Sequence, residues 1–206
     1  MRLPGGLPAF RLIIAIVCVL FAGVTFARAR QTPPLPTYWT VPPFHLQDQQ
    51  GRTVTDQDIA GKVVVANLIY THCPDICPAI LEPKMQQLQA LARQEKVLGT
   101  RVILVSFTAD PERDTPAVLN DFAAHFDADP AAWKFLTGQP DIIRQLMFEG
   151  FKLSMLHDSD AGTVVHDAHF LLIDQRHTVR AVYDAPDMLP AQVMYDVRAL
   201  LAERTH

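Results

Sequence analysis

Cysteine is scarce in this chain, with three among 206 residues. Cys18 lies inside an apolar run near the N-terminus, whereas Cys73 and Cys77 share one short stretch. A structural disulfide gains most when it closes a long loop, so two cysteines this close argue against a disulfide-stabilised scaffold. The pair indicates redox chemistry or metal binding instead.

An excess of positive charge is also missing. The 18 Lys and Arg residues against 22 Asp and Glu give a formal net charge of −4, and no long basic run occurs. The chain therefore lacks the concentration of positive charge that binds a phosphate backbone, and we expect no nucleic-acid partner. With 49% apolar residues it has enough hydrophobic material for one globular domain plus an extension.

The N-terminal region contains neither serine nor acidic residues. Its run from Leu12 to Ala27 is apolar and uncharged, with arginines on both sides. Such a run predicts membrane targeting, either as an uncleaved anchor or as a cleaved signal. We favour an anchor over residues 1–30, because Arg28 and Arg30 surround the supposed cleavage point. The absence of serine disfavours a mitochondrial transit peptide.

The rest of the chain predicts a spacer followed by one domain. Residues 31–43 hold five prolines and predict a semi-rigid spacer, which places the folded domain at residues 44–206. Strands are predicted at 63–70, 101–107, 133–136, 168–174 and 179–183, and helices starting near 81, 115, 141 and 190. This alternation predicts an α/β sandwich of the thioredoxin type, with a central mixed sheet flanked by helices.

Prolines disturb the start of the first of these helices. Pro74, Pro78 and Pro83 each lack an amide donor, so a regular helix cannot run smoothly through all three. We expect a bent or late-starting helix, with the cysteine stretch forming a loop or a single turn at its N-terminal end.

The spacing of Cys73 and Cys77 suits a chelating pair, because one helical turn would bring both sulfurs to one face. The adjacent helix N-terminus is expected to favour the thiolate forms. Redox dithiols usually have two intervening residues and this pair has three, which favours metal ligation without excluding disulfide exchange. Copper would need at least one more donor, and imidazole suits both of its oxidation states. Zinc would accept the same donors but normally takes four in a structural site.

The residues alone do not fix which of the eight histidines supplies that donor. His166 lies on the connection entering a predicted strand, where functional side chains often occur. His169 is its competitor, His72 adjoins the cysteine pair, and His157 falls in a predicted loop.

The stretch Asp110–Thr115 is acidic. We expect it to form a solvated loop, with Asp114 or Thr115 capping the helix that follows.

Three stretches together resemble the SCO/SenC family of copper chaperones. They are YTHCPDICP at 70–78, DPERDT at 110–115 and HDAHFLLID at 166–174. The resemblance covers most of residues 44–206. It implies a thioredoxin-like domain tethered to the inner membrane, which binds one copper ion, Cu(I) or Cu(II), through Cys73, Cys77 and His166. Asp167 replaces the family's customary Ser or Thr and His169 adds a second imidazole, which leaves open a shift of the ligand to His169.

The resemblance also implies a function and a location. Copper would be delivered to the CuA-bearing subunit of cytochrome c oxidase by a domain facing the periplasm, and other periplasmic copper chaperones are further candidate partners. The mitochondrial inner membrane is the alternative location. Such a protein is not an enzyme in the turnover sense. The alternative function is a thiol-disulfide oxidoreductase, in which Cys73 attacks a partner's disulfide and Cys77 resolves the intermediate.

Overall fold

The computed structural model describes residues 34–73, 76–152, 156–158, 163–165 and 168–203. The chain divides after Pro34, and the folded unit begins at Leu35. The anchor expected at residues 1–30 therefore lies outside the described residues. Within the described part, no helix is both long and apolar enough to cross a membrane.

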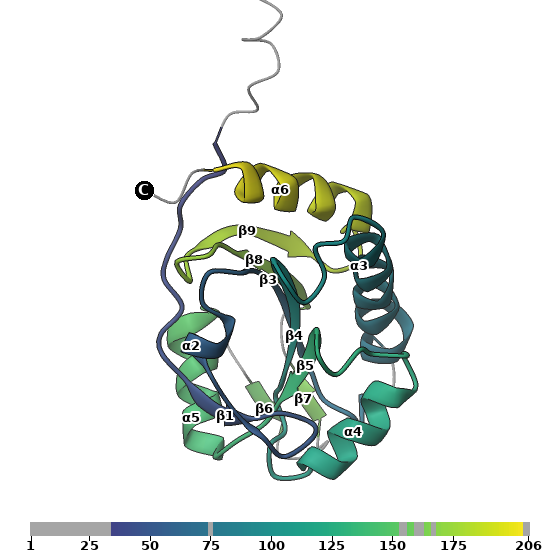
Figure 1. Cartoon of the computed structure of the whole chain (residues 1–206). Helices are drawn as coiled ribbons and strands as arrows, with labels where there is room; N and C mark the ends of the chain where they lie inside the picture. The colour runs from purple at the N-terminus through teal and green to yellow at the C-terminus, as the bar shows by residue number, and fades with distance from the viewer. Residues whose placement is uncertain (1–33, 74–75, 153–155, 159–162, 166–167, 204–206) are drawn as a thin grey trace, which may run out of the picture. The chain divides into compact units, whose positions relative to one another are not determined.

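A five-stranded mixed sheet forms the centre of the folded unit (Figure 1). In spatial order its strands are β5 (Trp133–Leu136), β4 (Val102–Thr108), β3 (Val63–Ile69), β8 (His169–Ile173) and β9 (Val179–Asp184). The pairs β3–β4 and β4–β5 are parallel, whereas β3–β8 and β8–β9 are antiparallel. The predicted central mixed sheet is confirmed.

Both faces of this sheet are covered, which is why β3 and β4 are buried along their whole length. One face packs against α3 (Glu82–Gln94), α4 (Pro116–Ala124) and α6 (Pro190–Ala202). The other face packs against the β1–β2 hairpin (His45–Gln47 and Thr53–Thr55), α2 (Asp56–Ile59), α5 (Pro140–Gln145) and the π-helical turn η2 (Leu146–Gly150). Figure 1 shows these two layers on opposite sides of the sheet. The thioredoxin-like α/β architecture follows from this arrangement.

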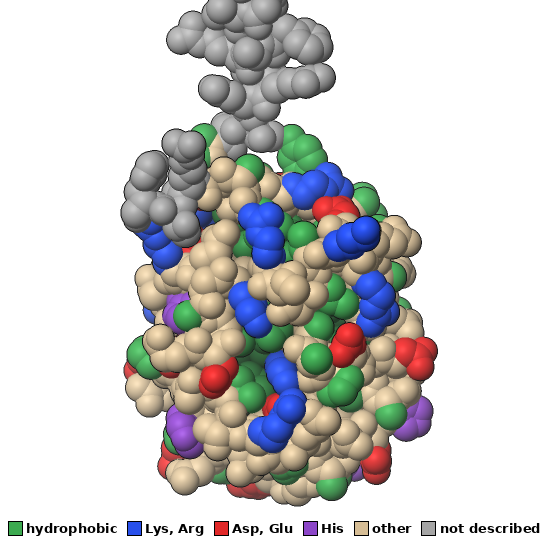
Figure 2. All heavy atoms as spheres, in the orientation of Figure 1, with side chains coloured by type: hydrophobic (Ala, Val, Ile, Leu, Met, Phe, Trp, Pro, Cys, Tyr) green, Lys and Arg blue, Asp and Glu red, His purple; other side chains and the backbone are tan. Residues whose placement is uncertain are grey.

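The surface on the side shown in Figure 2 is mixed in character. Basic and acidic side chains are interspersed there among hydrophobic ones, so charge of one sign does not form a continuous stripe on this face.

The helix after β3 starts as the prolines predict. A π-helical turn, η1 (Cys77–Leu81), precedes the regular helix α3, which begins at Glu82. Pro78 lies in the first turn of η1, where the missing amide donor costs nothing, whereas Pro83 lies just after η1 and cannot donate a backbone hydrogen bond to the turn before it. The expectation of a bent or late-starting helix is confirmed.

Residues 35–43, expected to belong to a spacer, are hydrogen bonded to the folded unit. The amide of Tyr38 donates to the carbonyl oxygen of Val179 at 3.0 Å, and the amide of Val179 donates to Trp39 at 2.8 Å. Arg180, only 7% exposed, donates to the carbonyl oxygens of Leu35 and Pro36, both at 2.8 Å.

The Arg180 guanidinium is also paired with two acidic side chains. It lies 3.0 Å from Asp174 and 2.8 Å from Glu203, so its charge is compensated inside the protein. Residues 35–41 are therefore bound to strand β9 and to the turn before it.

A second hairpin joins η2 to the central sheet. Its strands are β6 (Leu156–Asp158) and β7 (Thr163–Val165), which pair antiparallel. The sequence patterns predicted only a loop here.

Candidate functional site

Cys73 and Cys77 lie in the connection between strand β3 and helix α3. After β3 ends at Ile69, the amide of Cys73 donates to the carbonyl oxygen of Tyr70 at 3.1 Å and closes a tight turn. Cys77 opens η1 four positions later. The predicted loop-to-helix placement of the pair is confirmed.

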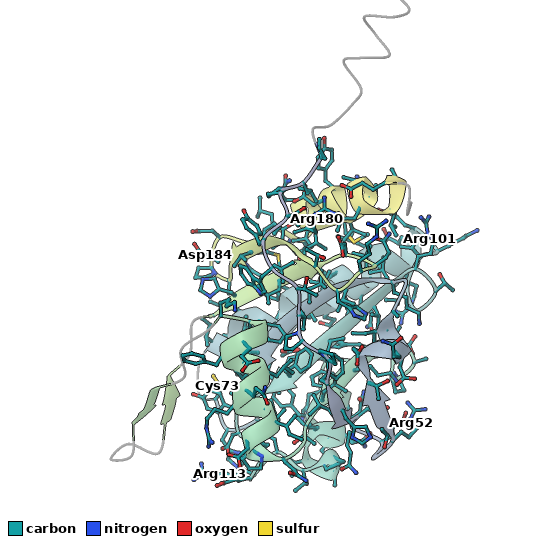
Figure 3. All side chains as sticks on the ribbon, turned by 90° about the vertical axis from the view of Figure 1, so that its left-hand side faces the viewer. Arg52, Cys73, Arg101, Arg113, Arg180 and Asp184 are labelled. Atoms are coloured by element: carbon teal, nitrogen blue, oxygen red, sulfur yellow. The ribbon has the colours of Figure 1, made fainter. Side chains whose placement is uncertain are left out.

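The structure brings the two cysteines together. The amide of Cys77 donates to the sulfur of Cys73 over 3.4 Å, and the two side chains are hydrogen bonded to one another. Neither cysteine is in a disulfide and both are buried, with Cys73 8% and Cys77 0% exposed. Cys73 is therefore the more accessible of the two cysteines. In Figure 3 it lies on the side of the domain opposite Arg52.

Burial decides the protonation of this pair. The pKa of the Cys77 thiol is raised well above its ordinary value, first by burial and then by the hydrogen bond with Cys73. The pKa of Tyr70 is raised to about 12 by burial and by a hydrogen bond with Cys73. We expect from the sequence that the helix N-terminus favours the thiolate forms, and for Cys77 burial acts in the opposite direction. A metal ion must displace this proton when it binds.

A buried carboxyl group, which the sequence analysis missed, lies at the start of α3. Glu82 is 0% exposed, and Nδ2 of Asn67 on β3 donates to its Oε1 at 2.9 Å. The Oε2 atom of Glu82 and the Oδ1 atom of Asn67 have no hydrogen-bond partner among the described residues. Burial raises the pKa of Glu82 to about 8, and the Asn67 bond only partly offsets it. One signal was present in the sequence, since Asn67 is the single polar residue within the apolar run of β3.

Asp114 is a second buried carboxylate near the cysteines. It is 0% exposed and accepts hydrogen bonds from Thr71, two residues before Cys73, and from Thr108 at the end of β4. The expectation of a fully solvated acidic loop is therefore wrong for Asp114. Thr115 is the helix cap, because its hydroxyl oxygen accepts from the amide of Val118 at 3.4 Å.

The structure describes some of the candidate histidines and not others. His166 and its neighbour Asp167 lie outside the described residues, and His157 lies on β6. His169, the first residue of β8, has Nε2 2.8 Å from Oδ1 of Asp184, while its buried Nδ1 has no partner among the described residues. His72 has Nδ1 3.2 Å from the hydroxyl oxygen of Thr71.

In the described part of the chain, no group of three His, Cys, Asp or Glu residues could hold a metal ion. Among the described residues, His169 does not form such a group with the two cysteines.

Comparison with known proteins identifies the family. The SCO1/SenC family model matches residues 33–202, which is most of the chain. The chain belongs to the SCO1/SenC family.

A curated relative of this SCO1/SenC protein is the SCO1 protein homolog of Bacillus subtilis (strain 168). The two are 30% identical over 166 residues, which cover 80% of this chain and 84% of the relative.

Two solved structures are similar over nearly their whole length. One is the structure of BsSco, which is described as a member of the Sco family of cytochrome c oxidase assembly proteins with a disulfide switch. Its TM-score is 0.72 and its sequence identity is 28%, and the match covers 84% of this chain and 100% of that chain. The structure of Bradyrhizobium japonicum ScoI with copper bound has a TM-score of 0.63 and 27% identity and covers 78% of this chain and 99% of that one.

The buried Glu82 makes stability depend on pH. Its pKa is about 8 in the folded protein and 4.5 ordinarily, so between these values the folded state holds a proton that the unfolded state has lost. The free energy of unfolding should therefore fall as pH rises from about 5 to 8, by at most about 1.4 kcal/mol per pH unit. Glu82→Gln lacks this dependence, so its stability relative to wild type should rise over the same window. Urea unfolding of the metal-free protein at several pH values checks this, and a difference that does not change with pH would contradict it.

Proposed function

We propose that this SCO1/SenC protein is a membrane-tethered copper metallochaperone. In this proposal it carries one copper ion, bound by Cys73, Cys77 and His166, to the CuA-bearing subunit of cytochrome c oxidase. The observation that carries the proposal is the buried dithiol, with two sulfurs facing each other at the junction of β3 and η1. Relatives with copper bound and with an oxidase-assembly role support it.

The donor set suits copper as cargo. Soft thiolates select Cu(I), and imidazole serves both oxidation states. Because the Cys77 thiol is protonated, uptake of copper releases protons and delivery can take them back. Copper would leave by ligand exchange with thiolates of the partner. Exchange begins at Cys73, since Cys77 is completely buried.

The proposal includes an anchor and a location. The apolar run between Leu12 and Ala27 would hold the protein in the inner membrane as a single pass, with the domain facing the periplasm. Arg180 fixes the chain at Leu35 and Pro36, so the connection from the anchor to the domain would be shorter than residues 31–43 suggest.

A second candidate function, thiol-disulfide exchange, is favoured by the same dithiol and by the disulfide switch described for BsSco. The Cys73 thiolate would attack a partner's disulfide, form a mixed disulfide and release one partner thiolate. The deprotonated Cys77 sulfur would then attack Cys73 and release the second. The partner gains two electrons and two protons, and this chain is left with a Cys73–Cys77 disulfide.

Copper titration tests the first proposal directly. The purified full-length protein should take up one equivalent of copper and show a thiolate-to-Cu(II) charge-transfer band. Cys73→Ser and Cys77→Ser should each abolish the band. Cys18→Ser is the matched control, because it removes the remaining cysteine of the chain, and it should change neither stoichiometry nor spectrum. Unaltered binding in the Cys73 and Cys77 variants would sink the proposal.

His166 separates the two candidate functions. His166→Ala should lower copper affinity at least about tenfold, since even residues outside the ligand shell of metal sites contribute that much. Disulfide exchange should continue at its wild-type rate, because it needs no imidazole. His169→Ala is the control, since His169 is held by Asp184 and, among the described residues, does not form a metal-binding group with the cysteines. Loss of copper in the His169 variant, with the His166 variant intact, would move the ligand to His169.

A further inference from the structure

Asp114 connects the loop that carries Cys73 to the rest of the sheet. Its Oδ2 accepts from the Thr71 amide at 3.1 Å and from the Thr108 hydroxyl at 2.6 Å, and its Oδ1 accepts from the Thr71 hydroxyl at 2.5 Å. These donors come from the segments that follow or end strands β3 and β4. Because the carboxylate is entirely buried, water does not replace any of these bonds.

The Thr71 contact falls inside the turn that sets the position of Cys73. The last ladder bond between β3 and β4 joins the amide of Ala109 to the carbonyl oxygen of Ile69 at 2.7 Å. Beyond it the turn from Tyr70 to Cys73 begins, and Thr71 is the second residue of that turn. Asp114 therefore fixes this turn by hydrogen bonds at the point where the hydrogen bonds between β3 and β4 end.

Asp114 is itself held from two directions. Its amide donates to the carbonyl oxygen of Asp110 at 2.9 Å, and the amide of Asp110 donates to the hydroxyl of Thr108 at 2.9 Å. The next residue, Thr115, caps helix α4. Figure 3 shows Arg113, the preceding residue, on the same side of the domain as Cys73. The carboxylate thus belongs to a fixed framework.

We propose that Asp114 is a positioning residue for the dithiol, which acts through Thr71 to hold the Cys73 sulfur at the distance and direction that Cys77 requires. This inference rests on the proposed function for its metal-binding consequence, but its effect on the two thiols does not need copper.

Asparagine at position 114 breaks the arrangement without changing its size. The one oxygen of asparagine cannot accept all three bonds, so either the Thr71 amide loses its acceptor or the Thr71 hydroxyl must change from donor to acceptor, and the charge that strengthens all three bonds is lost. Thr71→Val keeps the amide bond to Asp114 but removes the hydroxyl contacts with Asp114 and with His72, and Thr71→Ser retains both.

Asp48 provides a matched control on the opposite side of the domain. It is also 0% exposed and accepts from the amides of Gln50 and Arg52 at 2.9 and 3.0 Å, with Arg52 and Lys134 as ionic partners. Asp48→Asn should lower thermal stability by disturbing a network of the same kind. The partners of its side chain, Gln50, Arg52 and Lys134, do not include Thr71 or a cysteine, and Figure 3 places Arg52 away from Cys73.

The test compares Asp114→Asn, Thr71→Val, Thr71→Ser and Asp48→Asn with wild type in the full-length protein. Three quantities are measured: the thermal midpoint, the copper affinity by competition, and the alkylation rates of Cys73 and Cys77 in the metal-free protein by mass spectrometry. Asp114→Asn and Thr71→Val should change the ratio of the two alkylation rates and lower copper affinity about tenfold. Thr71→Ser should retain the wild-type values, and Asp48→Asn should lower only the thermal midpoint.

The proposal is overturned if Asp114→Asn lowers the thermal midpoint but leaves the alkylation ratio unchanged, or if Asp48→Asn changes that ratio equally. Should Asp114→Asn fail to fold, Thr71→Val decides the question in the same way. Wild-type protein that takes up no copper would defeat the proposed function, whereas the alkylation comparison would still decide the role of Asp114.

Discussion

The turn between strand β3 and helix α3 is buried, and this burial determines which hydrogen bonds the neighbouring segments must make. The chain leaves the sheet there, reverses and enters a π-helical turn, and two thiols and two carboxyl groups are kept away from water. A buried polar group without a partner costs about 1–3 kcal/mol, so the neighbouring strands must supply donors. Asn67 donates to Glu82, and Thr71 and Thr108 donate to Asp114. The strand ends are thereby tied to the segments on both sides of the cysteines.

The same burial shapes the chemistry that the dithiol can perform. Burial disfavours the charged thiolate form, so Cys77 keeps its proton until a metal ion displaces it or a base removes it. Cys73 keeps a small exposed area and Cys77 none, so the two sulfurs are not equivalent toward a partner. In both proposed functions, copper transfer and disulfide exchange, this asymmetry would make Cys73 react first. A single geometry therefore supports both candidate functions.

The sequence predicted those features that depend on local pattern. The unbroken apolar run of β3 indicates a strand covered on both faces, and Pro78 and Pro83 indicate an irregular helix start. Contacts between residues far apart in the chain could not be predicted from the sequence. Asp114 meets Thr71 across 43 positions, and Arg180 meets Leu35 across 145. Proline content indicates an extended segment at 31–43, but it does not reveal that β9 supplies partners for part of it. His166 stays a prediction from family resemblance, because it lies outside the described residues.

The most direct test of the account is the local environment of copper in the loaded protein, measured by X-ray absorption at the copper edge. The account predicts two sulfur scatterers and one imidazole nitrogen in the first shell. A first shell of nitrogen and oxygen alone would contradict it, because the buried dithiol would then not be the copper site.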